Sequence, residues 1–89
     1  KRLHGRGFSV IFLDNGRESS RIGISIGKKI KGAVVRNRIK RIFKESFRLH
    51  RDIYPQCADI VITVRPDFTL DSPDRIIQVV AHLMAAESV

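Results

Sequence analysis

Sulfur and aromatic residues are scarce in this chain: its 89 residues include one cysteine, one methionine, one tyrosine and no tryptophan. A single cysteine, Cys57, cannot form an internal disulfide or a multi-cysteine zinc site. No apolar run approaches the about 20 residues that cross a bilayer, and the N-terminus lacks a signal-peptide pattern. These absences exclude a disulfide scaffold and a transmembrane helix, and they agree with a reducing compartment.

Acidic residues are nearly missing from one long stretch. Residues 28–51, here called the basic segment, hold ten of the seventeen lysines and arginines but only one acid, Glu45. The chain's net charge of +8 is set by this segment. So concentrated a positive charge is typical of a surface that binds a polyanion. Eighty-nine residues otherwise predict one domain, residues 1–89, with a single small core.

The basic segment also has the period of a helix, from about Ala33 to His50, with Gly32 just before it. Residues at three- and four-residue steps form one face: Val35, Ile39, Ile42, Phe43, Ser46 and Leu49. The opposite face is basic: Arg36, Asn37, Lys40, Arg41, Lys44 and Arg48. Arg38 and Glu45 lie at the border between the two faces. One side of this helix can pack on a core while the other presents a basic stripe.

A solvated charged face is the ordinary alternative for such a stripe. That alternative predicts alternating Glu and Lys, paired four residues apart. Here five basic groups and one amide share the outer face, where like charges repel. A nucleic acid would offset that repulsion, so we favour nucleic-acid binding.

The remaining chain predicts three strands and a second helix. Residues 1–7 read as an extended lead-in. Strands are expected at Phe8–Leu13, Arg21–Ile26 and Ala58–Val64, the last of them central because it is apolar on both faces. Ser72 and Pro73 suit the start of a helix that continues to about Glu87. The order β-β-α-β-α predicts an α+β two-layer sandwich with the helices on one face of the sheet.

No other motif predicts chemistry. Gly27–Gly32 lacks the Lys-Ser or Lys-Thr of a phosphate loop, so we expect no nucleotide cofactor. The three histidines have no ligand spacing, and turn and capping roles explain Asp67, Asp71 and Asp74, so no metal site is expected. Cys57 is expected to be a buried or half-buried thiol. No nucleophile, base and acid can be assembled into a catalytic site.

Three stretches inside the basic segment resemble the protein subunit of bacterial ribonuclease P. These are Lys28-Lys29, the run AVVRNRIKR from Ala33 to Arg41, and ESFR from Glu45 to Arg48. The similarity extends more loosely from Phe8 to about Arg65. Gly27 and the order Lys31-Gly32 depart from the family, both at turn positions. The resemblance implies a fold like the second domain of ribosomal protein S5, with a left-handed crossover in place of the usual right-handed one.

The resemblance also implies a function and partners. A protein of this family assists a catalytic RNA, the ribonuclease P RNA subunit, in the endonucleolytic removal of the 5′ leader from precursor tRNA in the bacterial cytoplasm. Magnesium would act with the RNA subunit, and the protein itself would bind no cofactor and no membrane. The residues expected to contact the RNA subunit are Lys28, Lys29, Arg36, Asn37, Arg38, Lys40, Arg41, Lys44 and Arg48. Asn37 has a second possible role, as a cap of the local backbone.

A second surface is implied by the same resemblance, the sheet face that holds the single-stranded leader. Its residues here are Ser9, Ile11, Leu13, Arg21, Gly23, Ser25, Val61, Thr63 and Arg65. Relatives commonly have an aromatic residue near Ile11 that would stack on a base, which isoleucine cannot do. The family's basic N-terminal helix, one wall of this cleft, is not present in the chain, so we expect an N-terminally shortened domain whose leader binding is less secure.

Three rivals remain open at this point. An RNA-binding module of ribosomal-protein type would share the basic face without needing the Arg-Asn-Arg order. A helix-turn-helix DNA reader requires a second helix just before the basic one, where Arg21–Ile26 predicts a strand. A membrane-surface helix requires a free apolar face, which the strands need for their core.

Overall fold

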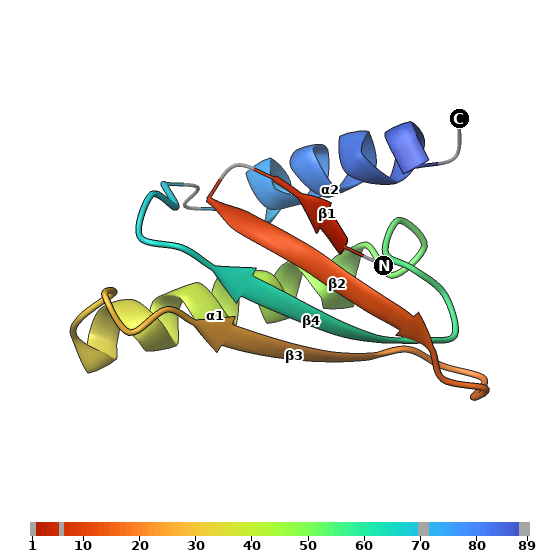
Figure 1. Cartoon of the computed structure of the whole chain (residues 1–89), viewed down its shortest axis with the longest axis horizontal. Helices are drawn as coiled ribbons and strands as arrows, with labels where there is room; N and C mark the ends of the chain where they lie inside the picture. Colours follow the sequence, from red (N-terminus) through yellow and green to blue (C-terminus); the bar gives the residue numbers. More distant parts are fainter. Residues whose placement is uncertain (1, 6, 70–71, 88–89) are drawn as a thin grey trace.

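A computed structural model of the chain describes residues 2–5, 7–69 and 72–87. Its elements follow one another as three strands, a helix, a strand and a helix (Figure 1). Their bounds are β1 Arg2–His4, β2 Phe8–Asp14, β3 Arg21–Ile26, α1 Ala33–Leu49, β4 Ala58–Val64 and α2 Pro73–Glu87. The Ser72 hydroxyl accepts a hydrogen bond from the Arg75 backbone N–H at 3.3 Å, so the predicted cap of α2 is present.

The strands form one mixed sheet in the order β1-β2-β4-β3. β4 is central, antiparallel to β2 and parallel to β3, which explains why its sequence is apolar on both faces. Both helices lie on the same side of the sheet, so the predicted α+β sandwich is confirmed (Figure 1). Since α1 lies behind the sheet in that view, the path from β3 through α1 to β4 is left-handed (Figure 1).

One strand was missing from the sequence prediction. The lead-in is extended, as expected, but Arg2–His4 pairs with β2 as an edge strand, with Arg2 opposite Ile11 and His4 opposite Ser9. The turn into β2 requires Gly7, whose φ is 74° and whose Cβ position would lie 2.4 Å from the Phe68 backbone. A short strand with two basic residues lacks apolar alternation, so its sequence has no strand signal, although such residues suit a sheet edge.

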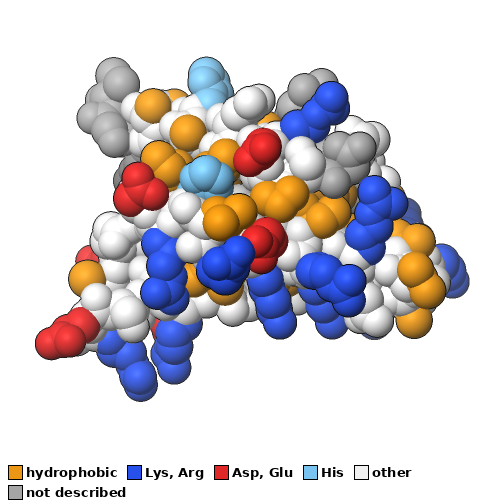
Figure 2. Space-filling view, turned by 180° about the vertical axis from the view of Figure 1, so that it is seen from behind, with side chains coloured by type: hydrophobic (Ala, Val, Ile, Leu, Met, Phe, Trp, Pro, Cys, Tyr) orange, Lys and Arg blue, Asp and Glu red, His pale blue; other side chains and the backbone are white. Residues whose placement is uncertain are grey.

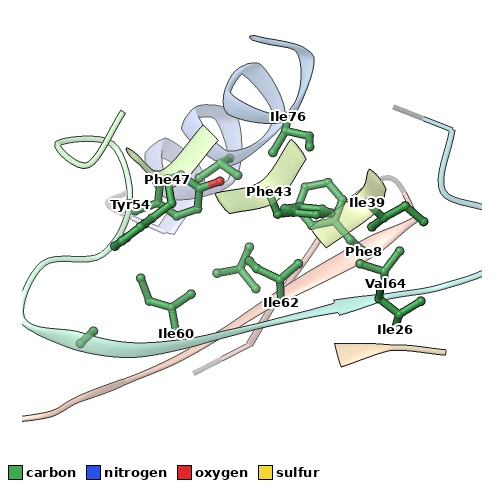
Figure 3. Close-up of a cluster of buried hydrophobic side chains, with 13 residues drawn as sticks. Phe8, Ile26, Ile39, Phe43, Phe47, Tyr54, Ile60, Ile62, Val64 and Ile76 are labelled. Carbon is green, nitrogen blue, oxygen red and sulfur yellow. The ribbon is translucent and has the colours of Figure 1, made fainter. Parts of the chain in front are cut away.

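The core lies between the sheet and the two helices (Figure 3). Phe43 of α1 is fully buried, with its ring centroid 5.1 Å from that of Phe8 and 5.3 Å from that of Phe68. Ile60, Ile62 and Val64 of β4 form the floor beneath these rings. α1 therefore has a fixed orientation about its axis, because one face is held by interlocking aromatic rings.

The predicted apolar face of α1 was wrong at both ends. Val35 and Leu49 are about half exposed, at 49% and 51%, whereas Phe47 is 7% exposed and belongs to the core. Ile39, Phe43, Ser46 and Phe47 are the buried residues of the helix. They form a narrower stripe than the one predicted, because only the middle and the C-terminal half of the helix are covered by the rest of the molecule.

Tyr54 closes the far end of this core, 1% exposed, with its ring against Phe47. Its hydroxyl lies 3.0 Å from the hydroxyl of buried Ser46. Burial raises the pKa of the Tyr54 phenol, and the hydrogen bond to Ser46 opposes that rise in part. The folded protein therefore holds the phenol proton more tightly than the unfolded chain does.

This shift predicts a loss of stability at alkaline pH. The unfolded tyrosine ionises at about 10, so its contribution is complete below that pH and is lost as the pH rises through the higher pKa of the folded state. We expect the free energy of unfolding in urea to fall as the pH rises above about 10. Tyr54→Phe should cost about 1 kcal/mol at pH 8 through the lost hydrogen bond and show a smaller fall. Equal falls in both proteins would contradict this assignment.

Cys57 differs from its prediction. The thiol is exposed, not buried, and the residue has a φ of 53°, in the left-handed region. Its backbone carbonyl accepts a hydrogen bond from the Asn15 N–H at 3.0 Å, which joins the loop before β4 to the turn after β2. The side chain points outward because the backbone is turning into β4 at this residue.

Candidate nucleic-acid interface

The outer face of α1 is strongly basic. Seen from behind the sheet, lysines and arginines gather along this helix and the turn before it (Figure 2). Seven of them are exposed, and their side chains form no ion pair or hydrogen bond with any described residue. These seven, here called the free cations, are Lys28, Lys29, Lys31, Arg38, Lys40, Arg41 and Lys44.

Asn37 lies within this surface. Its side chain forms no hydrogen bond with the described residues, so it does not cap the local backbone. Together with Lys40, Arg41 and Lys44 it lines a shallow hollow along the helix. An amide that can donate and accept among cations suits a phosphate or a ribose hydroxyl.

Arg48 is on the same face but is partly neutralised. Its guanidinium donates to both carboxylate oxygens of Glu45, with Nε 3.2 Å from Oε2. The hydrogen bond from Arg48 lowers the pKa of the Glu45 carboxyl, so the pair stays ionised near neutral pH. Glu45 therefore removes charge from the C-terminal end of the surface and leaves the middle of α1 unopposed.

Arg36 is placed differently from its prediction. The sequence assigned it to the outer stripe, but its guanidinium turns back and donates to the carbonyls of Gly27 and Ile30, at 3.1 and 3.0 Å. It also lies 3.4 Å from the carbonyl of Ile26. Helical spacing predicts the direction of the Cα–Cβ bond, but it does not predict where the end of a long side chain lies. The sequence therefore could not show that the Arg36 guanidinium turns back to these carbonyls.

The N-terminus of α1 adds to the positive potential. Gly32 precedes it without a side-chain cap, and the first turn contains no acid. The unpaired backbone N–H groups at the start of a helix attract anions. Lysine and arginine residues near this start add to that attraction. Seven cations concentrated on one helix and its preceding turn fit a ligand with several regularly spaced negative charges, such as a nucleic-acid backbone.

The face of the sheet away from the helices is open, as predicted. Leu13 is 73% exposed and Val61 42% exposed, and the neighbouring positions are small or partly exposed. Those neighbours are Ile11, Gly23, Ser25 and Thr63. No Phe, Tyr or Trp is among them, so these positions offer apolar and small polar contacts.

Two residues predicted for that face, Ser9 and Arg65, form hydrogen bonds within the protein. Ser9 is 3% exposed because Arg65 donates to its hydroxyl at 2.6 Å and His4 approaches it at 3.0 Å. The Arg65 guanidinium also donates to the carbonyls of Gly5 and Phe8, at 2.8 and 3.1 Å. Arg65 thus fastens the β1–β2 turn to β4, a long-range role that strand alternation cannot predict.

Arg21 sits at the other end of the open face in a tight ion pair. It donates to both oxygens of Asp59 at 2.9 Å, and the Asn15 amide donates to the same carboxylate at 3.2 Å. The hydrogen bonds from Arg21 and then Asn15 lower the pKa of Asp59. Because β3 and β4 are parallel neighbours with Arg21 opposite Asp59, this pair also marks their register.

Other candidate sites gain no support. The described residues hold no group of three or more histidine, cysteine or acidic side chains that would suit a metal ion. Asp71 lies outside the described residues, and His50 approaches Asp74 at 4.0 Å near the start of α2. None of the helices in the described ranges is long and apolar enough to span a membrane.

The geometry also removes two rivals. Arg21–Ile26 is a strand paired to β4, so no helix-turn-helix precedes the basic helix. The apolar face of α1 is packed on the sheet through Ile39, Phe43 and Phe47, so it is not free to lie on a lipid surface. Fold and surface together define a small α+β domain with one strongly basic helix face, of the kind that suits a nucleic acid.

Comparison with known proteins identifies the family within this class. The sequence profile described as Ribonuclease P matches residues 1–87, so the chain belongs to the ribonuclease P protein family. The ribonuclease P protein component of Desulfotalea psychrophila is 60% identical over 83 residues, covering 93% of this chain and 69% of the relative. The component of Dictyoglomus thermophilum is 46% identical over 57 residues, covering 64% of this chain and 48% of the relative.

Solved structures agree with this family. The ribonuclease P protein of Thermotoga maritima superposes with a TM-score of 0.81 at 30% identity, covering 97% of this chain and 82% of that one. The Staphylococcus aureus protein gives a TM-score of 0.76 at 30% identity and covers all of this chain and 82% of its own. The family and the fold class predicted from the Arg-Asn-Arg segment are therefore confirmed.

Proposed function

We propose that this protein is the RNA-binding protein component of a ribonuclease P and that the outer face of α1 is its contact with the RNA subunit. The observation that carries the proposal is the set of seven free cations on one helix and one turn, with no acidic partner among the described residues. Release of the counterions condensed on RNA would drive binding to such a face, so affinity should fall steeply with salt.

The chain itself supplies charge and shape in this proposal, and not bond-breaking chemistry. The RNA subunit, with magnesium ions, would catalyse hydrolysis of precursor tRNA in the bacterial cytoplasm. The protein would reduce repulsion between phosphates and so favour the active RNA fold. The Arg-Asn-Arg order, with Asn37 between two arginines on an exposed helix, favours this role over that of a ribosomal-type module, which needs only the charge.

The open sheet face is the proposed second contact, to the 5′ leader of precursor tRNA. Its accessible residues are Ile11, Leu13, Ser25, Val61 and Thr63. Ser9 and Arg65 would form the floor at one end, because both are engaged in the β1–β2 turn. Without a Phe, Tyr or Trp among these residues, we expect leader contacts to be weaker than those made by α1.

Cleavage of precursor tRNA by a bacterial ribonuclease P RNA, measured at low magnesium with and without the 89-residue chain, tests both contacts. Stimulation is expected, because added positive charge replaces part of the magnesium needed for folding of the RNA. A precursor with a long leader and one with a leader of a single nucleotide serve as matched substrates. A larger stimulation for the long leader would support the sheet face.

Two other results have distinct meanings. Salt-sensitive binding to the RNA without stimulation would keep the α1 contact and contradict the leader contact. Equal affinity for the ribonuclease P RNA and for an unrelated folded RNA of similar length, again without stimulation, would contradict the proposed function and favour the ribosomal-type alternative.

A further inference from the structure

We propose that Arg36 is a positioning residue, which holds the turn Gly27–Ile30 so that Lys28 and Lys29 both face the RNA, and that it does not contact the RNA itself. This inference rests on the proposed function, because Lys28 and Lys29 are taken to bind the RNA subunit. It assigns the first arginine of the Arg-Asn-Arg segment a different role from the second, Arg38.

The turn has a defined geometry. The N–H of Ile30 donates to the carbonyl of Gly27 at 3.1 Å, which makes Lys28 and Lys29 the two central residues of a four-residue turn. The N–H of Gly27 donates to the carbonyl of Val64 at 3.0 Å and fastens the turn to the end of β4. Both lysine side chains are exposed at the tip of the turn and have no partner in the part of the chain that the structure describes.

Arg36 fastens the same turn from the other side. Its Nη1 donates to the carbonyls of Gly27 and Ile30, the two residues that flank the lysine pair, at 3.1 and 3.0 Å. Its Nη2 lies 3.4 Å from the carbonyl of Ile26, the last residue of β3. One guanidinium therefore joins the end of a strand, both ends of the turn and the first part of α1.

Only arginine suits this position. The guanidinium presents five donors in a rigid plane, whereas the lysine ammonium is a point charge on a flexible stem. Donors used on three carbonyls are not available for a phosphate.

The consequence for binding is preorganisation. Lys28 and Lys29 are adjacent like charges, and a loose turn would let them separate into many conformations. Ordering them on the RNA would then cost part of the affinity that their contacts supply. A turn already held by Arg36 avoids that cost, so the effect of Arg36 on affinity should depend on the two lysines.

The test is a double-mutant cycle in binding to ribonuclease P RNA across a salt series. Arg36→Lys keeps the charge and removes the three-carbonyl link, and we expect it to weaken binding about tenfold. In the Lys28→Ala/Lys29→Ala background the same change should weaken binding less than about twofold, because non-additivity marks residues that act through one another. Arg38→Lys is the matched control, since the Arg38 side chain has no hydrogen bond or ion pair with the described residues and its effect should be equal in both backgrounds.

A measurement on the unchanged protein covers the case in which a variant folds poorly. With ¹⁵N-labelled arginine, the Arg36 guanidinium signals should be sharp in the free protein and move little when RNA is added, while those of Arg38 and Arg41 should move strongly. Amide exchange at Ile30 should be faster in free Arg36→Lys than in the unchanged protein.

Equal losses from Arg36→Lys in both lysine backgrounds, or a large shift of the Arg36 signals on RNA binding, would overturn the inference and make Arg36 a direct contact. Either result would leave the proposed function standing. Failure of the unchanged protein to bind ribonuclease P RNA would instead contradict the proposed function.

Discussion

Reversing the charge at two free cations of α1, in Lys40→Glu/Lys44→Glu, is expected to reduce affinity for ribonuclease P RNA by more than about 60-fold at roughly 0.1 M salt. The figure follows from two lost phosphate contacts, each of which changes the salt slope by about 0.9. Repulsion between the new carboxylates and the RNA adds to this loss. Filter binding or fluorescence anisotropy at several salt concentrations would measure both the affinity and the slope.

The matched control removes the same charge from another part of the surface. Arg2→Glu/Arg17→Glu changes two exposed arginines, in β1 and in the turn after β2, which lie outside the basic segment. Its salt slope should stay close to that of the unchanged protein. If both variants lose affinity and slope equally, net charge alone explains binding, and the outer face of α1 is not the interface.

The strands and helices that could be predicted from the sequence are those with one clear hydrophobic pattern. β3 and β4 have the predicted bounds, since alternation in the first and a continuous apolar run in the second each stop at a turn. α1 was found because Ala33 to Leu49 has a helical period without proline. β1 was not found because an edge strand of three residues is stabilised by pairing and by the turn at Gly7, which are tertiary facts.

The candidate site was predictable as a surface and not as a set of contacts. Charge and period located Lys40, Arg41 and Lys44 on the outer face, where they are exposed. The same reasoning treated Arg36 as a ligand, and the family resemblance did so for Arg65, although both donate to backbone carbonyls of turns. A long arginine reaches several residues away, so its partner depends on which carbonyls the fold leaves unpaired nearby.

Phe43→Ala is expected to cost about 3–5 kcal/mol of folding stability, because it removes a fully buried ring that joins α1 to the sheet. Its partners Phe8 and Phe68 would face a cavity, with centroids that now lie 5.1 and 5.3 Å away. A small domain has a total stability of about 5–15 kcal/mol, so this single change should bring the protein close to unfolding. Val34→Ala, on the same helix at a side chain that is 82% exposed, is the control and should change stability by less than about 0.5 kcal/mol.

RNA binding separates this core effect from the surface effect. RNA that binds only the folded state shifts the population toward it, so Phe43→Ala should bind with an affinity reduced by the unfolded fraction and with an unchanged salt slope. Lys40→Glu/Lys44→Glu should show the opposite pair of results, a nearly normal urea unfolding transition and a smaller slope. A reduced slope in Phe43→Ala would mean that the ring does more than fold the domain: it would also fix the rotation of α1 that aligns the free cations with the phosphates.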